Sequence, residues 1–197
     1  MVCFTLLLFS CDRNKKLTEM VQAMQNKEIS LPATIRPYQH TDRDTIDWTQ
    51  STNNRIVVYF SSDMCTVCNI NKLHEWDKIK KRYENWDIVY VLSYQEKKEE
   101  DIIEAITNNN VNDMIIYLDK NDLFRKANPF IPDYPLLHVF LIDSNNRIKI
   151  VGDPLYNNKV LQLYDDCYIS CTGSLKSQSG NIIKKCSTSS LPASRRQ

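Results

Sequence analysis

The sequence contains little glycine, no excess of either charge and no long hydrophobic run. Glycine accounts for 3 of the 197 residues, whereas its average usage is about 7%. This scarcity excludes the glycine-rich loops that hold the phosphates of nucleotides. Lys and Arg total 25 against 24 Asp and Glu, so no charge excess favours binding to nucleic acid or to an anionic membrane surface. No apolar run reaches the ~20 residues that a membrane-spanning helix requires.

Hydrophobic residues make up 42% of the chain, which is enough to form a core and excludes wholesale disorder. The length predicts one domain with some additional chain. Asparagine takes over turn positions, because its side chain tolerates the left-handed backbone conformation. Asn-Asn pairs separate the apolar runs at 53–54, 108–109, 145–146 and 157–158.

The first eleven residues form a short apolar segment that ends in a cysteine. Residues 2–9 are mainly apolar, and Leu8-Phe9-Ser10-Cys11 precedes a polar stretch. This resembles a bacterial lipobox, in which a small residue directly precedes the cysteine that is acylated. No Lys or Arg comes before the run, and the run is short for a signal peptide; a buried strand is the alternative. We expect a signal peptide at 1–10 and a lipid anchor on Cys11. The protein would then lie in the cell envelope, on the periplasmic or outer-membrane face, where disulfides persist.

Residues 11–54 are predicted to be an N-terminal linker. Residues 12–27 carry apolar side chains at helical spacing, which predicts an amphipathic helix that packs on the domain. Residues 29–35 are predicted to form a short strand, and Pro32 and Pro37 place it at a sheet edge. The helical stripe consists of Leu17, Met20, Val21 and Met24.

Residues 55–166 show a regular alternation of strand and helix patterns. Strands are predicted at 55–60, 87–93, 114–118, 137–142 and 147–151. Helices are predicted at 65–83, 96–107, 122–127 and 157–164. The inward-facing residues are Val67, Ile70, Leu73, Trp76 and Ile79 in the first helix, and Ile102, Ile103 and Ile106 in the second.

This order predicts an α/β fold with a mostly parallel sheet of about five strands and helices on both faces. A turn at 143–146 adds an antiparallel edge hairpin. Residues 167–197 are predicted to be a flexible polar tail. The tail cysteines match no zinc-ligand pattern and are interpreted as a tail disulfide or as incidental thiols; they are Cys167, Cys171 and Cys186.

Cys65-Thr66-Val67-Cys68 follows the first buried strand and begins a helix. The N–H groups at a helix N-terminus favour an anion and lower the pKa of a thiol there. Cys68 lies one helical turn further on, close enough to attack a mixed disulfide formed at Cys65. Cys65 is therefore the predicted nucleophile and Cys68 the resolving thiol.

Other interpretations of this pair are open. A closed disulfide could brace the helix start without reacting. Zinc would need two more ligands, and neither His74 nor His138 has a suitable spacing; two thiolates could hold copper(I). We interpret His74 as a surface residue, and His138 and Trp76 as core residues.

Several segments resemble the thioredoxin-like family, including its redoxin and TlpA-type thiol–disulfide oxidoreductases. Phe60-Ser-Ser-Asp-Met-Cys-Thr-Val-Cys68 is similar to the family's active-site strand, turn and helix. Residues 140–143 and 145–152 are similar to its penultimate hairpin. Residues 20–32 and 151–160 also resemble thioredoxin-domain lipoproteins common in Bacteroidetes. The resemblance covers residues 17–166 and implies a thioredoxin-like fold for 55–166.

Two positions depart from the family pattern. Met64 stands where the family usually has Trp before the first cysteine. The family's cis-proline position falls near Leu137, and Pro135 comes two residues earlier. The resemblance implies that Met64 and Pro135 contact the substrate.

We expect a cell-envelope thiol–disulfide oxidoreductase that exchanges disulfides with partner proteins through Cys65 and Cys68. No cofactor and no nucleic acid is expected, and the membrane is reached through lipid on Cys11. The alternative is a redox-inactive lipoprotein that keeps the fold as a binding or scaffold module. A peroxidase is a third possibility, although no Thr-x-x-Cys signature is present at Cys65.

Overall fold

The computed structural model describes residues 3–38, 53–111 and 114–176. The helices are α1 (Cys3–Met24), α2 (Thr66–Ile70), α3 (Asp77–Arg82), α4 (Glu99–Asn108), α5 (Leu123–Ala127) and α6 (Asn158–Lys176). The 3-10 helices are η1 (Leu73–Trp76), η2 (Glu96–Lys98) and η3 (Pro135–Leu137). The strands are β1 (Arg36–Pro37), β2 (Arg55–Phe60), β3 (Asp87–Tyr94), β4 (Ile115–Lys120), β5 (Val139–Ile142) and β6 (Ile148–Val151).

The described strands form one six-stranded sheet in the order β1-β4-β3-β2-β5-β6. The pairs β2–β3 and β3–β4 are parallel, whereas β1–β4, β2–β5 and β5–β6 are antiparallel. The predicted α/β class is confirmed, and the sheet is mixed rather than mostly parallel.

The strand direction changes between β4 and β5. The chain leaves β4, forms α5 and η3, and returns along the free edge of β2 in the opposite direction, so that Val139 lies opposite Val58. The predicted turn at 143–146 then reverses the chain into β6, and the Asp143 carboxylate accepts the backbone N–H groups of Asn145 and Arg147. Strand–helix alternation alone does not specify the direction of the next strand. The path between the helix and that strand determines the end of the sheet at which the chain enters it, and here that path includes η3.

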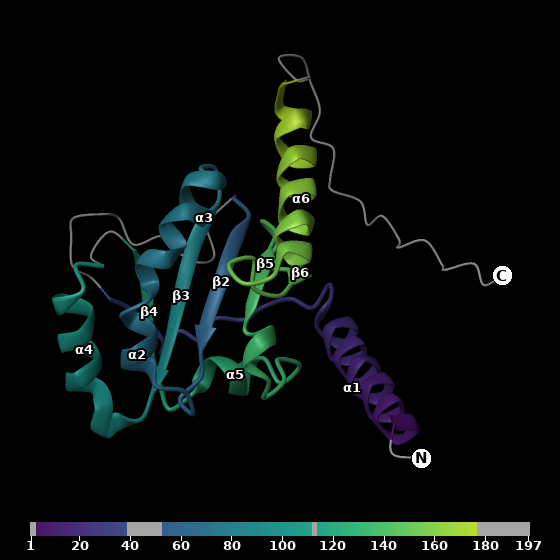
Figure 1. Ribbon diagram of the computed structural model, residues 1–197. Coiled ribbons are helices and arrows are strands. Elements are labelled where there is room, and N and C mark those ends of the chain that lie inside the picture. Colours follow the sequence, from purple (N-terminus) through teal and green to yellow (C-terminus); the bar gives the residue numbers. More distant parts are fainter. Residues whose placement is uncertain (1–2, 39–52, 112–113, 177–197) are drawn as a thin grey trace.

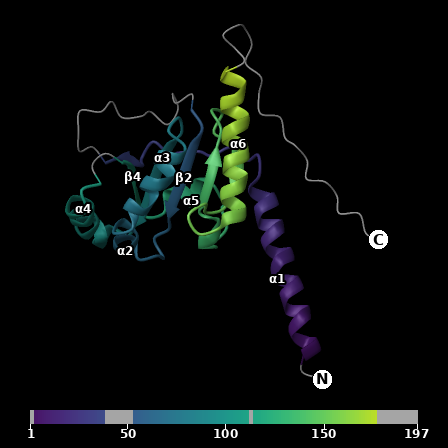
Figure 2. The same ribbon diagram turned by 45° about the horizontal axis from the view of Figure 1, so that its top comes forward.

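Each strand sends alternate side chains to opposite faces, so the sheet has a core on each side. Ile56 and Val58 of β2 point to the core under α2, α3, α4 and α6. Val57 and Tyr59 point to the second core, where α5 and the end of α1 pack. Helices therefore cover both faces, as predicted (Figure 1, Figure 2).

The N-terminal segment differs in detail from the prediction. The predicted helix is present within α1, and its apolar stripe packs on the second core. The strand expected at 29–35 is instead β1, at 36–37, although it does lie at the sheet edge beside β4. Pro32 has no N–H to donate, and its carbonyl accepts the Ile35 N–H in a turn. Glu28 pairs with Arg147 next to β6, and β1 lies at the other edge of the sheet, so residues 29–35 cross the second core's face as a loop.

The helix predicted at 65–83 is broken into α2, η1 and α3. Its inward-facing residues recur every three positions, which matches the period of a 3-10 helix better than the 3.6 of an α-helix. A straight α-helix would carry this row around its surface. The break lets Ile70, Leu73, Trp76 and Ile79 all be buried.

The helix predicted at 96–107 is η2 followed by α4. Ile102 and Ile106 are buried as predicted, but Ile103 is 38% exposed. Ala105 is buried in its place, because it lies three residues after Ile102 on the same helix face.

The closing helix is longer than predicted. α6 continues through Lys176, so residues 167–176 of the expected tail are helical. Residues 177–197 lie outside the described part of the chain. Among the described residues, no helix is both long enough and apolar enough to cross a membrane.

Candidate active site

Cys65 and Cys68 lie where the chain passes from β2 into α2. β2 ends at Phe60, and the Met64 N–H donates to the Ser61 carbonyl at 3.0 Å to close a turn. α2 begins at Thr66, so Cys65 is its N-cap residue. The predicted placement of the pair, after a buried strand and at a helix start, is confirmed.

The two cysteines form a disulfide with their Cα atoms 5.3 Å apart. Both residues are exposed to solvent. The backbone N–H of Cys68 donates a hydrogen bond to the Cys65 sulfur at 3.3 Å. A hydrogen bond to the charged form of a group favours that form, so the same N–H favours a thiolate on Cys65 after reduction. The division of roles between the two sulfurs stays a prediction.

Thr66, the residue between the two cysteines that is buried, attaches α2 to the sheet. Its hydroxyl donates to the Ser93 carbonyl of β3 at 2.9 Å. The Ser93 hydroxyl in turn donates to the carbonyl of Asp119 on β4 at 3.2 Å. The start of α2 is therefore connected to two neighbouring strands through buried hydrogen bonds.

Asp119 is a buried carboxyl group that the sequence analysis did not identify. Its two oxygens accept the backbone N–H groups of Leu123 and Phe124, at 2.8 and 3.2 Å, and so cap α5. Burial raises the pKa of Asp119, and these two hydrogen bonds oppose that shift. The available signal was an acidic residue at the end of an apolar strand, four residues before a short helix.

Met64 follows β2 and Pro135 precedes β5, and these two segments lie at the same end of the paired strands. β5 runs antiparallel to β2, and the Tyr59 N–H donates to the His138 carbonyl at 2.9 Å. The residues that precede β5 therefore lie beside those that follow β2. Pro135 begins η3, and every peptide bond in the described residues is trans. The substrate contacts of Met64 and Pro135 stay predictions.

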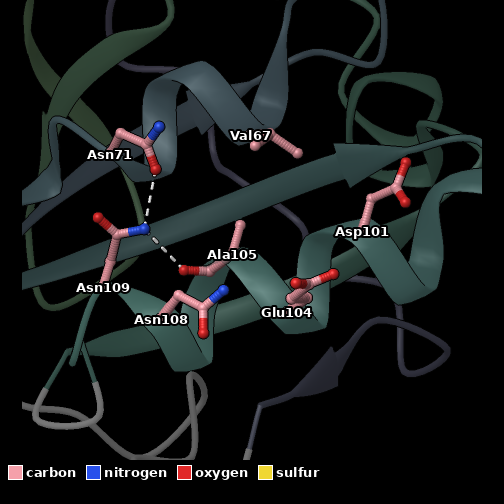
Figure 3. A pocket seen from close by; sticks show the side chains of 7 residues that line it. All are labelled: Val67, Asn71, Asp101, Glu104, Ala105, Asn108 and Asn109. Atoms are coloured by element: carbon pink, nitrogen blue, oxygen red, sulfur yellow. Dashed lines mark hydrogen bonds between the residues drawn. The ribbon is translucent and has the colours of Figure 1, made fainter.

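A shallow groove runs between α2 and α4, beside the cysteine pair. Its volume is about 340 Å³. Val67 lies on the α2 side, and the carboxylates of Asp101 and Glu104 lie on the α4 side (Figure 3). The remaining lining residues are Asn71, Ala105, Asn108 and Asn109.

Asn109 connects the two walls of this groove. Its side-chain amide donates to Asn71 Oδ1 and to the Ala105 carbonyl, at 2.8 Å each (Figure 3). The residue after α2 is thus held to the end of α4, which restrains the far end of the helix that carries Cys68.

Tyr59 and His138 are buried side by side at this end of the β2–β5 pair. Their rings lie 4.8 Å apart between centroids, and a nitrogen of His138 is 2.9 Å from the Pro132 carbonyl. Burial lowers the pKa of His138, an effect that the hydrogen bond to Pro132 opposes. The interpretation of His138 as a core residue is confirmed.

Four other singled-out residues have described side chains, namely Trp76, His74, Cys167 and Cys171. Trp76 is buried and His74 is exposed, as predicted. Cys171 accepts a hydrogen bond from the Asn54 amide at 3.7 Å, and Asn54 precedes β2, whereas the pair follows it. α6 therefore places Cys167 and Cys171 at the opposite end of the strand. The side chain of Cys11 and all of Cys186 lie outside the described residues.

Comparison with known proteins gives structural similarity only. No protein-family model and no curated protein matches the sequence. A thioredoxin-like protein solved in its oxidised form superposes with a TM-score of 0.50 at 13% identity, covering 75% of this chain and 97% of that one. An uncharacterised thioredoxin-like protein from Porphyromonas gingivalis gives a TM-score of 0.46 at 16% identity, covering 72% and 91%. The sheet order, the helices on both faces and the first of these similarities together show that the chain has a thioredoxin-like α/β fold.

Proposed function

We propose that this protein is a thiol–disulfide oxidoreductase that exchanges disulfides with partner proteins through Cys65 and Cys68. The supporting observation is the solvent-exposed disulfide at the start of α2, in which the Cys65 sulfur accepts the Cys68 N–H. An exposed sulfur can be reached by a second disulfide, and a sulfur that accepts a hydrogen bond carries negative charge more easily.

In the reduced protein, the Cys65 thiolate attacks one sulfur of a partner's disulfide. A Cys65–partner bond forms, the partner's S–S bond breaks, and one partner thiolate leaves. Cys68 then loses its proton and attacks the Cys65 sulfur, which releases the second partner thiolate and forms the Cys65–Cys68 disulfide. Two electrons pass to the partner. The reverse sequence oxidises a partner dithiol, and the relative reduction potentials set the direction.

The fold provides the restraint that this exchange needs. The hydroxyl of Thr66 holds the start of α2 to β3, and Asn109 holds the end of α2 to α4. Cys68 therefore stays one helical turn from Cys65 when the disulfide opens, which keeps the resolving step intramolecular.

The exposed surface around the pair suits a polypeptide substrate. Leu136, directly after Pro135, is 66% exposed, and Val67 lies on one wall of the groove between α2 and α4. A partner segment that places its disulfide over Cys65 would cover apolar surface on both sides of it.

A trapping experiment tests the proposed exchange. The variant Cys68→Ala removes the resolving thiol, so it should accumulate mixed disulfides between Cys65 and partner proteins. These are detected as higher-mass species that a reductant cleaves. Cys65→Ser is the matched control and should trap nothing. Equal rates of insulin reduction by the wild type and Cys65→Ser would favour a binding or scaffold module instead.

The envelope location is a separate part of the proposal and is supported by the sequence pattern that ends at Cys11. Signal-peptide cleavage before Cys11 and acylation of its thiol would place the domain at a membrane surface, with the part of α1 that follows Cys11 between the anchor and the sheet. Mass spectrometry of the mature chain from a bacterial host tests this. A lipid-modified N-terminal Cys11 is the expected result, and a chain that still begins at Met1 would contradict it.

A further inference from the structure

Arg125 on α5 contacts carboxylates from three segments, one of which leads into Cys65. Its guanidinium is 3.3 Å from the carboxylate of Asp63, 2.8 Å from that of Asp122 and 2.7 Å from that of Asp133. Asp63 lies two residues before Cys65, and Asp133 lies in the loop that precedes η3. The Arg125 side chain therefore joins the loop that leads into the disulfide to the loop that precedes η3.

Buried neighbours of Arg125 restrain the position of its side chain. Asp122, one of its three partners, is 6% exposed and accepts a hydrogen bond from the Tyr59 hydroxyl. The preceding residue in α5, Phe124, is buried against the Tyr59 ring at 5.3 Å between centroids. The Arg125 side chain is itself only 24% exposed. Most exposed ion pairs join two mobile side chains, whereas this guanidinium is held by buried groups.

In the described residues, Arg125 is the cation that pairs with these three carboxylates. Three carboxylates meet a single guanidinium, and Asp63 is the carboxylate nearest to Cys65 in the chain. Three carboxylates and one guanidinium carry a net charge of −2, and without Arg125 the cluster would carry −3, so the potential around Asp63 would become more negative. A like charge disfavours an anion, so that potential would oppose a thiolate on Cys65.

We propose that Arg125 is a positioning residue for disulfide exchange, which holds the loop containing Asp63 against α5 and offsets the charge of the Asp63 carboxylate, two residues before Cys65. This inference rests on the proposed function, because it concerns the reactivity of the same pair. Arg125 acts through Asp63, and its loss leaves both cysteines in place.

The test measures the reactivity of Cys65 directly, without a disulfide substrate. In the reduced full-length protein, the rate of Cys65 alkylation by iodoacetamide at neutral pH is followed by mass spectrometry. Arg125→Gln should slow this rate about three- to tenfold, since removing one nearby charge changes an ionisation equilibrium by roughly that factor. Arg125→Lys keeps the charge and should recover most of the rate.

A second readout is the equilibrium of the pair with glutathione. A less stable thiolate disfavours the reduced form, so Arg125→Gln should shift this equilibrium toward the Cys65–Cys68 disulfide by up to the same factor. The matched control is Arg82→Gln, which removes an arginine paired with Asp165 at 2.6 Å on α3 and α6. It should change neither the rate nor the equilibrium.

The variants of Asp63 separate this role from general destabilisation. Asp63→Asn combined with Arg125→Gln removes the carboxylate nearest to Cys65 in the chain and returns the net charge of the cluster to its wild-type value, so it should restore part of the lost alkylation rate. A structural defect at Arg125 would not be repaired in this way. Asp63 is exposed, with 61% of its side chain accessible, so Asp63→Asn should fold even if Arg125→Gln does not. Alone, it should speed alkylation.

The outcomes distinguish the two proposals. If the wild type fails to exchange disulfides but Arg125→Gln still slows alkylation, the proposed function is wrong, and what stands is the effect of Arg125 on the reactivity of Cys65. If the wild type exchanges disulfides and Arg125→Gln matches it in alkylation and in the glutathione equilibrium, the role of Arg125 is wrong. An unchanged rate in Asp63→Asn, or no recovery in the double variant, also overturns it.

Discussion

The backbone N–H of Cys68 donates a hydrogen bond to the sulfur of Cys65 across a distance of 3.3 Å. The two cysteines therefore differ in their surroundings, although both are exposed and they share one disulfide. Cys65 occupies the N-cap position, where its sulfur is an acceptor, and Cys68 lies inside the first turn of α2. This asymmetry is the physical reason for assigning them different roles.

The first prediction concerns the order in which the two thiols react. In the reduced protein, Cys65 should be alkylated about tenfold faster than Cys68, because only the thiolate is nucleophilic and the Cys68 N–H favours it on Cys65. Limiting iodoacetamide followed by peptide mass spectrometry resolves each cysteine. Equal rates, or faster modification of Cys68, would refute the assignment.

The second prediction concerns the buried hydroxyl of Thr66. Thr66→Val keeps the side-chain shape but removes the donor to the Ser93 carbonyl. It should lower the free energy of unfolding by about 1–3 kcal/mol, because a buried acceptor loses its partner. Urea unfolding measures the difference. Thr107→Val is the control, since Thr107 makes the same kind of bond to the Ile103 carbonyl at an exposed site; an equal loss in both variants would count against the prediction.

The third prediction concerns the connection between α2 and α4. Asn109→Ala removes the donor to Asn71 and to the Ala105 carbonyl. At ~0.5–1.5 kcal/mol for each hydrogen bond, and less where solvent competes, the free energy of unfolding should fall by about 1–2 kcal/mol. Asn108→Ala, at the neighbouring exposed position in the same groove, should change it much less. Indistinguishable unfolding midpoints for the two variants would show that Asn109 does not hold the groove together.

The fourth prediction concerns the pH dependence of stability. Burial lowers the pKa of His138 below its ordinary value of 6.5. Between the lowered pKa and 6.5, the unfolded chain binds more protons than the folded one, so the free energy of unfolding contributed by His138 falls as the pH falls through this window. The charged groups that act on His138 are Arg125, Asp133 and Asp122.

Urea unfolding above and below this window, on the wild type and on His138→Gln, measures that contribution. Gln can still donate to the Pro132 carbonyl but does not titrate. The variant should therefore show a shallower loss of stability on acidification than the wild type. A pH dependence as steep as that of the wild type would show that His138 is not responsible.

Local patterns in the sequence determined most of the elements and the location of the cysteine pair. The β-branched run at 55–60 forms β2, and the residues that follow it form the turn and the N-cap. The Asp143 turn forms the hairpin between β5 and β6. In each case the determining interactions join residues a few positions apart, and residue type and spacing carry that information.

Only the tertiary structure decided what depends on residues far apart in the chain. The antiparallel pairing of β5 with β2 depends on the path between β4 and β5. The break in the helix after Ile70 depends on packing against the sheet, and the contact between Arg125 and Asp63 joins residues 62 positions apart. Such contacts are selected by the burial and charge that become available when the whole domain packs, and no local spacing encodes them.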